Sequence, residues 1–336
     1  MIKKIVSLGH GSGGKHTREL IREVFAGNFG MSEPLTDSAI LNIACERIAF
    51  TTDSYVVDPL FFPGGNIGKL AVCGTVNDLA VSGARPLYLS ASFIIEEGFS
   101  LEDLEAVAVS MAEEAQKAGV KIVTGDTKVV EKGKCDGLFI TTSGTGILPA
   151  GREYISTGIR IRPGDKLIIN GPLGNHSIAV LGARNNLSFT TTVVSDCASL
   201  NNLIESLCDK CSEILFMRDL TRGGLAGVLN ELVQITGTGI LIDENRIPVD
   251  DPVRGACEML GFDPLYLANE GKILIVAGSG TESEVLKILR SDPLGSISEV
   301  IGEIIPDARK RVIMNSVTGG KRIVDMPSGV QLPRIC

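Results

Sequence analysis

The chain ends in a cysteine, Cys336, on a segment whose composition is typical of an extended arm. Residues 325–336 include Pro327 and Pro333, which bias the backbone toward extended conformations, and they show no helical or strand period. Roughly ten extended residues reach on the order of 33 Å, enough to cross a domain. A thiol on such an arm is suited to carrying a group between two sites. The alternative is a disordered end with an incidental cysteine.

The reactivity of this thiol depends on its neighbours. The terminal carboxylate should raise the pKa of Cys336, and the guanidinium of Arg334 should lower it. A thiolate is therefore not assured. We expect the arm to be mobile and the thiol to have no packing role.

Four aspartates occur in separate parts of the first half: Asp37, Asp53, Asp78 and Asp126. We expect Asp53 and Asp126 to follow apolar strands directly, and Asp78 to lie in a largely apolar helix. A carboxylate in such surroundings is costly unless a cation or hydrogen bonds compensate it. A single aspartate of this kind is usually a cap or a turn residue. Four favour divalent cations that hold the phosphates of a nucleotide, because Mg2+ binds a few carboxylates together with phosphate oxygens.

A glycine-rich loop near the start, residues 9–17 (GHGSGGKHT), nearly matches a phosphate-binding P-loop. His16 stands where a P-loop has its magnesium-binding Ser or Thr, and the mixed pattern of helices and strands argues against the all-parallel sheet of that fold. The loop can still donate backbone N–H groups to a phosphate at a helix start. The candidate donors are Gly11, Ser12, Gly13 and Gly14.

Composition limits the classes of protein that the chain can belong to. With 336 residues, 44% of them apolar, it is long enough for two globular domains. A net charge of −8, no Trp and 4% aromatic residues argue against nucleic-acid binding. We recognise neither a signal peptide nor an apolar run long enough to span a membrane, so we expect a cytoplasmic protein. Cys208 and Cys211 form a single CxxC pair in an expected helix, which favours a structural over a metal or redox role.

The pattern of apolar residues predicts two α+β domains, over residues 1–155 and 156–324, followed by the tail over residues 325–336. In the first domain we expect strands over residues 48–52, 87–95, 120–124 and 138–142, and helices over residues 18–25, 67–82 and 101–117. In the second we expect strands over residues 166–170 and 273–277 and near residue 240, and helices over residues 199–215, 225–236 and 282–290.

Seven motifs, in order along the whole chain, resemble those of the HypE family of hydrogenase maturation proteins. They are residues 9–14 (GHGSGG), 51–70 (TTDSYVVDPLFFPGGNIGKL), 77–78 (ND), 125–128 (GDTK), 219–224 (DLTRGG), 268–271 (ANEG) and 333–336 (PRIC). This family belongs to the aminoimidazole ribonucleotide synthetase superfamily, which also includes selenophosphate synthetase and thiamine monophosphate kinase.

The resemblance implies a two-domain aminoimidazole ribonucleotide synthetase-like fold, a homodimer that pairs through its N-terminal domains, and ATP bound near that interface. It also implies a reaction. The carbamoyltransferase HypF loads a carbamoyl group onto Cys336, and ATP drives dehydration of this thiocarbamate to a thiocyanate. The cyano group then passes to iron on the HypC–HypD complex, as a ligand for the [NiFe] hydrogenase site.

The same resemblance assigns roles to residues of this chain. It implies Mg2+ at Asp37, Asp53, Asp78 and Asp126. It implies ATP binding by these aspartates other than Asp37, by the glycine loop (Gly11, Ser12, Gly13 and Gly14), and by Asn66 and Arg222. The catalytic residues would be Cys336, Glu270 and Lys128, the last two as candidates for proton transfer. On residue type alone, Glu270 could equally be a surface carboxylate and Lys128 a solvated cation. We interpret His10 and His16 as ordering the loop, and His176 as structural.

Two alternatives remain open. Within the superfamily the chain could be a selenophosphate or ribonucleotide synthetase, but the Cys or selenocysteine expected beside the glycine loop of a selenophosphate synthetase is absent from residues 9–15. Outside it, the chain could be a non-catalytic carrier that only presents Cys336 to partners. ATP turnover distinguishes the carrier from the enzymes.

Overall fold

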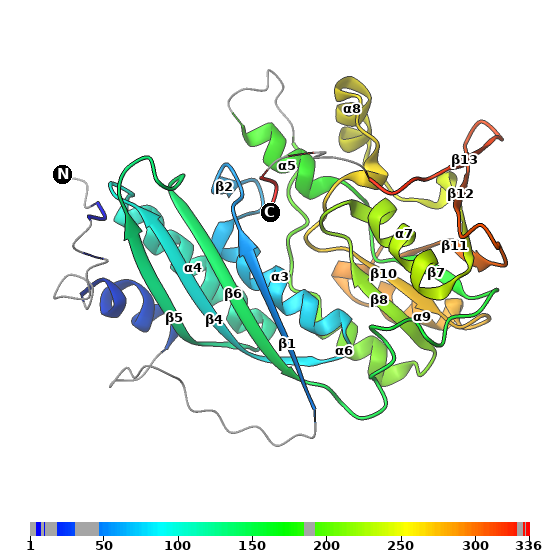
Figure 1. Cartoon of the computed structure of the whole chain (residues 1–336), viewed down its shortest axis with the longest axis horizontal. Coiled ribbons are helices and arrows are strands. Elements are labelled where there is room, and N and C mark those ends of the chain that lie inside the picture. Colours follow the sequence, from blue (N-terminus) through cyan, green and yellow to red (C-terminus); the bar gives the residue numbers. More distant parts are fainter. Residues whose placement is uncertain are drawn as a thin grey trace.

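The structure is a computed structural model, and it describes residues 5–7, 10, 19–30, 47–184, 192–327, 332 and 334–336. Two sheets, each with helices packed against it, account for most of this part of the chain (Figure 1). The mixture of helices and strands is the α+β class expected from the sequence.

The first half forms a four-stranded sheet in the order β1-β6-β4-β5, in which only β4 and β5 run parallel. Helices α3 and α4 cover one face of this sheet, and a short hairpin, β2–β3, precedes α3 (Figure 1). The bounds are β1 Ile48–Tyr55, β2 Phe61–Phe62, β3 Gly65–Asn66, α3 Ile67–Val81, β4 Arg85–Glu96, α4 Leu101–Ala118, β5 Lys121–Val130 and β6 Leu138–Ile147.

Local sequence explains where the two covering helices begin and end. The Ser100 side chain accepts a hydrogen bond from the N–H of Asp103 at the start of α4, and Gly119 ends the helix in the left-handed conformation. The Asn66 side chain caps α3 in the same way, by accepting from the N–H groups of Gly68 and Lys69. Helix α3 is buried on nearly all sides because it packs between the sheet, α4 and the second half of the chain.

The second half forms a seven-stranded sheet in the order β13-β12-β9-β11-β7-β10-β8. Helix α7 packs on one face of this sheet, whereas α6 and α9 pack on the other. The strands are β7 Lys166–Ile169, β8 Ile214–Asp219, β9 Gly239–Asp243, β10 Ile273–Ala277, β11 Glu299–Ile305, β12 Val312–Asn315 and β13 Lys321–Ile323. The helices are α5 Asn175–Ala183, α6 Asn201–Lys210, α7 Gly224–Thr236, α8 Asp251–Leu260 and α9 Glu282–Arg290, with short turns η3 Glu244–Arg246, η4 Pro264–Tyr266 and η5 Pro293–Gly295.

Near the start of the chain, the helix expected over residues 18–25 is described from residue 19 onward. It continues as the π-helix η2 Ile21–Ala26 and the short helix α2 Gly27–Phe29, and Gly30 ends it with a φ of 64°. Val24 and Phe25 are buried on this segment, and Phe25 stacks on Phe93 of β4 with 4.5 Å between ring centroids.

Several expected bounds were wrong. The helix expected over residues 199–215 ends at Lys210, and the apolar run that follows is strand β8, buried between the two helical layers. Strands β1 and β5 extend beyond the expected ranges, so Asp53 and Asp126 lie within strands rather than after them. Both strands continue because their ladders with β6 and β4 continue past these aspartates.

One of the hydrophobic clusters contains residues of both halves. The cluster around α3 and α4 includes residues of α5 and α8, such as Ile178 and Val253, and also Ile335 near the end of the chain. The junction between the halves is therefore packed. Among the residues that the structure describes, none of the helices has the length and apolar content needed to cross a membrane.

Candidate active site

Four carboxyl groups lie close enough at the junction of the two halves to affect one another's charge: Asp53, Asp78, Asp219 and Glu270, which we call the acidic cluster. Asp53 lies on β1 and Asp78 on α3, which packs against β1. The other two come from the second half, at the end of β8 and in the loop before β10. Neither half holds the complete cluster.

Asp53 and Asp78 are fixed by short hydrogen bonds on neighbouring elements. The Thr51 hydroxyl donates to Asp78 Oδ2 over 2.9 Å, and Asp53 Oδ1 accepts from the N–H of Ser54 over 2.9 Å. Burial raises the pKa of Asp78, Asp53 raises it further, and the Thr51 hydrogen bond opposes the rise. The Asp78 carboxylate therefore lacks full compensation within the described chain, and a carboxylate pair of this kind suits a bound cation.

Asp219 is a member that the sequence predictions did not include. Its backbone pairs with Ile273 where β8 meets β10. Burial raises the pKa of Asp219 to about 7, with further contributions from Asp78 and Asp53 and with Arg218 opposing. The sequence held a usable signal, because Asp219 ends an apolar strand in the same motif that supplied Arg222.

Glu270 is the most enclosed carboxyl group of the cluster. Its exposed fraction is 3%, and its Oε1 atom has no hydrogen-bond partner among the described residues. Burial raises the pKa of Glu270 well above its usual value, and the carboxyl groups of Asp219 and Asp196 add to the rise. An unpartnered carboxyl oxygen at a junction of two domains is available to a ligand.

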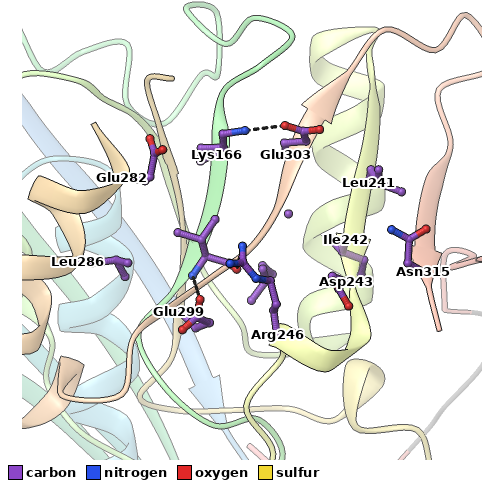
Figure 2. Close-up of a pocket in the computed structure, with 13 residues that line it drawn as sticks. Lys166, Leu241, Ile242, Asp243, Arg246, Glu282, Leu286, Glu299, Glu303 and Asn315 are labelled. Carbon is purple, nitrogen blue, oxygen red and sulfur yellow. Dashed lines mark hydrogen bonds and ion pairs between the residues drawn. The ribbon is translucent and has the colours of Figure 1, made fainter. Parts of the chain in front are cut away.

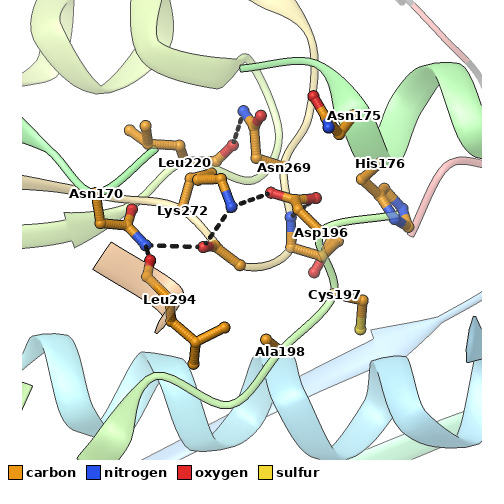
Figure 3. A network of polar contacts seen from close by, with 12 residues as sticks. Asn170, Asn175, His176, Asp196, Cys197, Ala198, Leu220, Asn269, Lys272 and Leu294 are labelled. Carbon is orange, nitrogen blue, oxygen red and sulfur yellow. Dashed lines mark hydrogen bonds and ion pairs between the residues drawn. The ribbon is translucent and has the colours of Figure 1, made fainter. Parts of the chain in front are cut away.

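A polar network holds the loop that carries Glu270 (Figure 3). Asp196 Oδ1 accepts from the Glu270 N–H over 3.2 Å, and Asp196 Oδ2 lies 3.4 Å from Lys272 Nζ in a buried ion pair. The side-chain amide of Asn269 donates to the carbonyl oxygens of Leu267 and Leu220. The loop is thus tied both to the end of β8 and to the segment that contains Asp196. The position of Glu270 is therefore set by the backbone of its loop rather than by hydrogen bonds of its side chain.

The end of the arm lies between the two halves, near β2 (Figure 1), and its thiol feels the charges of Glu270, Asp53 and Asp219. The N–H of Val56 donates to Cys336 O over 3.2 Å, and the N–H of Asp58 donates to Arg334 O over 3.2 Å, so the arm runs antiparallel to the segment that follows β1. Ile335 is buried, with an exposed fraction of 4%. The expectation that the terminal thiol has no packing role was wrong, because Cys336 packs against the core cluster around α3.

The environment of the thiol also differs from the expected one. Burial raises the pKa of Cys336 to about 12, Glu270 contributes next, and Arg222 opposes the rise. The sequence had suggested the terminal carboxylate and Arg334 as the main influences. Arg334 instead forms an ion pair with Asp136. In this position the raised pKa favours a neutral thiol beside carboxyl groups.

Arg222 lies immediately before α7, at a turn through Gly223. Its side chain is exposed, and its positive charge lowers the pKa of both Asp78 and Cys336. An exposed guanidinium that faces the acidic cluster and the thiol at a helix start is suited to binding phosphate.

The chain does not bring Asp126 and Lys128 to the cluster. Asp126 pairs with Ser92, Ser92 with Thr141, and Thr141 with Ser54, so Asp126 shares a sheet face with Ser54. Adjacent residues of a strand point to opposite faces, so Asp53 points to the other side, toward α3. On the outer face Lys128 Nζ lies 3.0 Å from Asp126 Oδ2, and both side chains are exposed. The Lys128 hydrogen bond lowers the pKa of Asp126.

The remaining predicted ligands give less information. Asn66 is buried, and its side-chain oxygen caps α3. Asp37 and the loop residues Gly11, Ser12, Gly13 and Gly14 lie outside the described residues, as does His16. In the described part of the chain, no group of three or more His, Cys, Asp or Glu side chains is arranged as a ready metal site.

Two other features lie away from the cluster. A cavity of about 490 Å³ in the second half lies against β9 and β11 (Figure 2). Its charged side chains are partly matched with one another, as in the ion pair between Lys166 and Glu303, and no predicted site residue lines it. Cys208 lies in α6 and the buried Cys211 follows it; both are free thiols, and burial raises the pKa of Cys208 to about 11. The structural interpretation of this pair agrees with that placement.

Comparison with known proteins identifies close relatives over the whole length. Family profiles for AIR synthase related protein match residues 35–148 with the N-terminal domain and residues 162–315 with the C-terminal domain. The chain is 51% identical to the carbamoyl dehydratase HypE of Rhodobacter capsulatus, over 98% of each chain.

Solved structures agree. One of the hydrogenase maturation protein HypE in complex with ATP is 43% identical, with a TM-score of 0.92, over 98% of this chain and 99% of that chain. Another, of a HypE–HypF complex, includes a chain that is 51% identical, with a TM-score of 0.80, over 83% of this chain and 90% of that chain.

Proposed function

Because the chain belongs to the HypE family of carbamoyl dehydratases, we propose that it uses ATP to dehydrate a carbamoyl group on the Cys336 sulfur to a thiocyanate. The observation that carries the proposal is the buried position of Cys336 at the acidic cluster. The thiol lies among the carboxyl groups that a nucleotide site needs, and Glu270 is the carboxyl group with the largest influence on its pKa. A carrier that only presented Cys336 to partners would have no reason to bury it there.

The chemistry requires that a poor leaving group become a good one. The carbamoyl oxygen takes the γ-phosphoryl group of ATP, and the nitrogen loses a proton, so that a C=N bond forms. Loss of the second nitrogen proton then expels phosphate and leaves C≡N on the sulfur. Positioning and electrostatic stabilisation supply most of the rate enhancement in phosphoryl transfer.

We assign proton removal to Glu270, because its Oε1 is unpartnered among the described residues and its charge acts directly on the Cys336 thiol. In the ligand-free chain the surrounding carboxyl groups favour its protonated form. A cation bound by Asp53 and Asp78, with Asp219 beside them, would lower the pKa of Glu270 toward the range that a base needs. When bound, Mg2+ would neutralise charge on the transferring phosphoryl group. Arg222 would hold phosphate at the start of α7.

A homodimer accounts for the outer face of the first sheet. Phe50, Ile48 and Ile94 are exposed there, with fractions of 67%, 55% and 43%. Pairing two such faces would remove these apolar side chains from water. It would also bring Asp126 and Lys128 against the partner subunit, which supports a role for them in a nucleotide site near the interface.

Partner proteins would supply and remove the group. We propose HypF as the source of the carbamoyl group, a proposal supported by the similar HypE chain solved with HypF, and the HypC–HypD complex as the acceptor of cyanide. We place these reactions in the cytoplasm.

Mass spectrometry of the C-terminal peptide tests the function. After loading by the carbamoyltransferase, the Cys336 peptide should carry one carbamoyl group, and it should lose the mass of one water only when ATP and Mg2+ are added. Cys336→Ala should bind ATP but carry no adduct. An adduct on another cysteine, or water loss without nucleotide, would refute the proposal.

A further inference from the structure

The imidazole of His176 joins the terminal arm to the body of the protein. Nε2 lies 2.9 Å from the carbonyl oxygen of Ile335, and Nδ1 lies 2.8 Å from the Ser195 hydroxyl. A carbonyl oxygen only accepts hydrogen bonds, so Nε2 carries the proton and donates it to Ile335. Nδ1 then accepts from Ser195, whose oxygen accepts from the N–H of Cys197 over 3.1 Å. Each polar atom of this chain of contacts has a defined role.

The ring is held in place without help from the arm. His176 is fully buried, and Phe62 packs against it edge to face, with 5.4 Å between centroids and an interplanar angle of 88°. The N–H of Ser195 donates to Pro63 O over 2.8 Å, which fixes the residue that orients the ring. Phe62, Pro63 and Ser195 belong to the body, so the Nε2 donor is preorganised for the arm.

The docked arm needs such contacts because one of its residues has an unfavourable backbone conformation. Arg334 has a φ of 54°, in the left-handed region that residues with a side chain rarely adopt. Its Nε donates to Val56 O over 2.8 Å, and its carbonyl oxygen accepts from Arg184 Nη2 over 2.7 Å. These hydrogen bonds offset the cost of the Arg334 backbone only while the arm is bound to the body of the protein. The bound and released states of the arm therefore differ little in free energy.

We propose that His176 is a positioning residue: by holding the peptide group of Ile335 it seats the Cys336 sulfur beside Glu270, and it lets the arm go for loading. The proposal rests on the proposed function, in which the arm must leave the site and return. A purely structural histidine, as the sequence suggested, would make permanent contacts only. Here Nδ1 is hydrogen-bonded to Ser195 of the body, and Nε2 is hydrogen-bonded to Ile335 of the arm, which has to move.

Two substitutions separate the hydrogen bond from the volume of the ring. His176→Phe keeps an aromatic ring against Phe62 but has no donor, whereas His176→Gln restores a donor near the Nε2 position. The measurement is the rate at which iodoacetamide alkylates Cys336 in the full chain, with the half-buried Cys208 of α6, on which no arm residue acts, as an internal reference. Loss of one hydrogen bond should raise the Cys336 rate about three- to tenfold in the Phe variant. The Cys208 rate should not change, and Gln should return the Cys336 rate toward that of the wild type.

A second readout links the seat to the reaction. In single turnovers of chain that is already carbamoylated, His176→Phe should slow the ATP-dependent loss of water by a similar factor. ATP affinity should stay at the wild-type value, and carbamoyl loading should be no slower than in the wild type, because loading takes place on the released arm. Alkylation does not depend on carbamoyl chemistry, so a failure of the proposed function would appear as wild-type chain that never loses water, with the alkylation difference intact. A folded Phe variant whose Cys336 is alkylated at the wild-type rate would overturn the positioning role.

If the Phe variant does not fold, the wild-type ring can be observed directly. The sequence contains three histidines, so the nitrogen-labelled imidazole signals can be assigned individually. Deletion of residues 334–336 should shift the Nε2–H signal of His176 and speed its exchange with water, because its acceptor is gone, while Nδ1 keeps its contact with Ser195. An Nε2–H signal that is the same with and without these residues would also overturn the proposal.

Discussion

At the residue scale, the account depends on a carboxyl group whose own hydrogen bonds are incomplete. Glu270 is buried, one of its oxygens is unpartnered among the described residues, and the thiol that would carry the substrate lies close by. A buried carboxyl oxygen without a hydrogen-bond partner is costly. A protein that keeps such a group therefore uses it in function or pairs it with a bound ligand.

Replacing Glu270 with Gln tests that use. The amide keeps the shape but cannot take a proton, so dehydration of loaded chain should slow by about 10² to 10⁴, the usual contribution of a general base. ATP binding, followed by calorimetry, should change little. Rapid-quench mass analysis measures the dehydration rate, and a wild-type rate in this variant would assign the proton to another group.

Asp219 gives a pH prediction for chain free of Mg2+ and nucleotide. Below a pH of about 4 its carboxyl group is protonated in both the folded and the unfolded chain. Between that value and its folded pKa of about 7, only the unfolded chain releases the proton, so stability falls as pH rises. Above that range the difference is constant.

Asp219→Asn should remove the part of the fall in stability between about pH 4 and pH 7 that Asp219 causes. At pH 8 the variant should be more stable than the wild type by about 2 kcal/mol, since partial exposure reduces the full effect of the raised pKa. Near pH 4 the two chains should have equal stability. Urea unfolding at several pH values measures the difference, and parallel curves for the two chains would contradict the assignment.

Sequence reasoning named candidate residues, but it did not predict which of them lie together in the fold. Cys336, Glu270, Asp53 and Asp78 were named from motifs, and the chain brings them together. Asp126 was grouped with Asp53 because both are aspartates on apolar strands, yet the sheet register places them on opposite faces. A one-dimensional pattern gives the period of a strand, whereas the face that a side chain shares with a distant strand depends on the ladder between them.

At the element scale, α3 positions the cluster, since it places Asp78 beside Thr51 and Asp53 of β1. The close approach of α3 to α4 depends on Gly68. A Cβ at this position would meet the backbone oxygen of Val107 and the side chain of Met111 on α4. The backbone oxygen cannot move without the helix.

Gly68→Ala should therefore destabilise the chain by about 1–3 kcal/mol, as overpacked cores do, and weaken ATP binding by displacing Asp78. Gly255→Ala in α8 is the matched control, because it is also a helical glycine and a Cβ there meets nothing within 4 Å. That change should stabilise by about 0.5–1 kcal/mol. Urea unfolding of both variants measures the contrast, and equal effects would show that α3 and α4 have room to separate.

Helix α4 was predicted closely, whereas the boundary between α6 and β8 was not. Helix α4 has an N-cap serine and a terminal glycine, and its expected bounds are confirmed to within one residue. Helix α6 was extended into β8 because the apolar residues after Cys211 fit either period, and only burial between two helical layers makes them a strand. Hydrogen bonds tie residues 334–336 to Val56 and Asp58, just after β1, and no local pattern in a Pro-containing tail could indicate these contacts.

At the scale of the whole molecule, the exposed apolar residues on the outer face of the first sheet lead us to predict a homodimer that pairs through this face. Phe50→Glu puts a charge at the centre of the proposed pairing surface and should give a monomer in light scattering at micromolar concentration. Val317→Glu is the control, since Val317 is similarly exposed, at 61%, in the turn between β12 and β13. If the subunits complete each other's nucleotide site, the monomer should also bind ATP more weakly. A dimer that persists with Glu at this position would move the interface elsewhere.

The fate of the carbamoyl oxygen tests the central claim most directly. Chain loaded with a carbamoyl group that contains a heavy oxygen isotope should, after one turnover with ATP and Mg2+, release that isotope in inorganic phosphate, because the oxygen leaves while bonded to phosphorus. Mass spectrometry of the phosphate measures it, alongside the loss of one water from the Cys336 peptide. The heavy isotope in water, with unlabelled phosphate, would contradict phosphorylation of the carbamoyl group at this site.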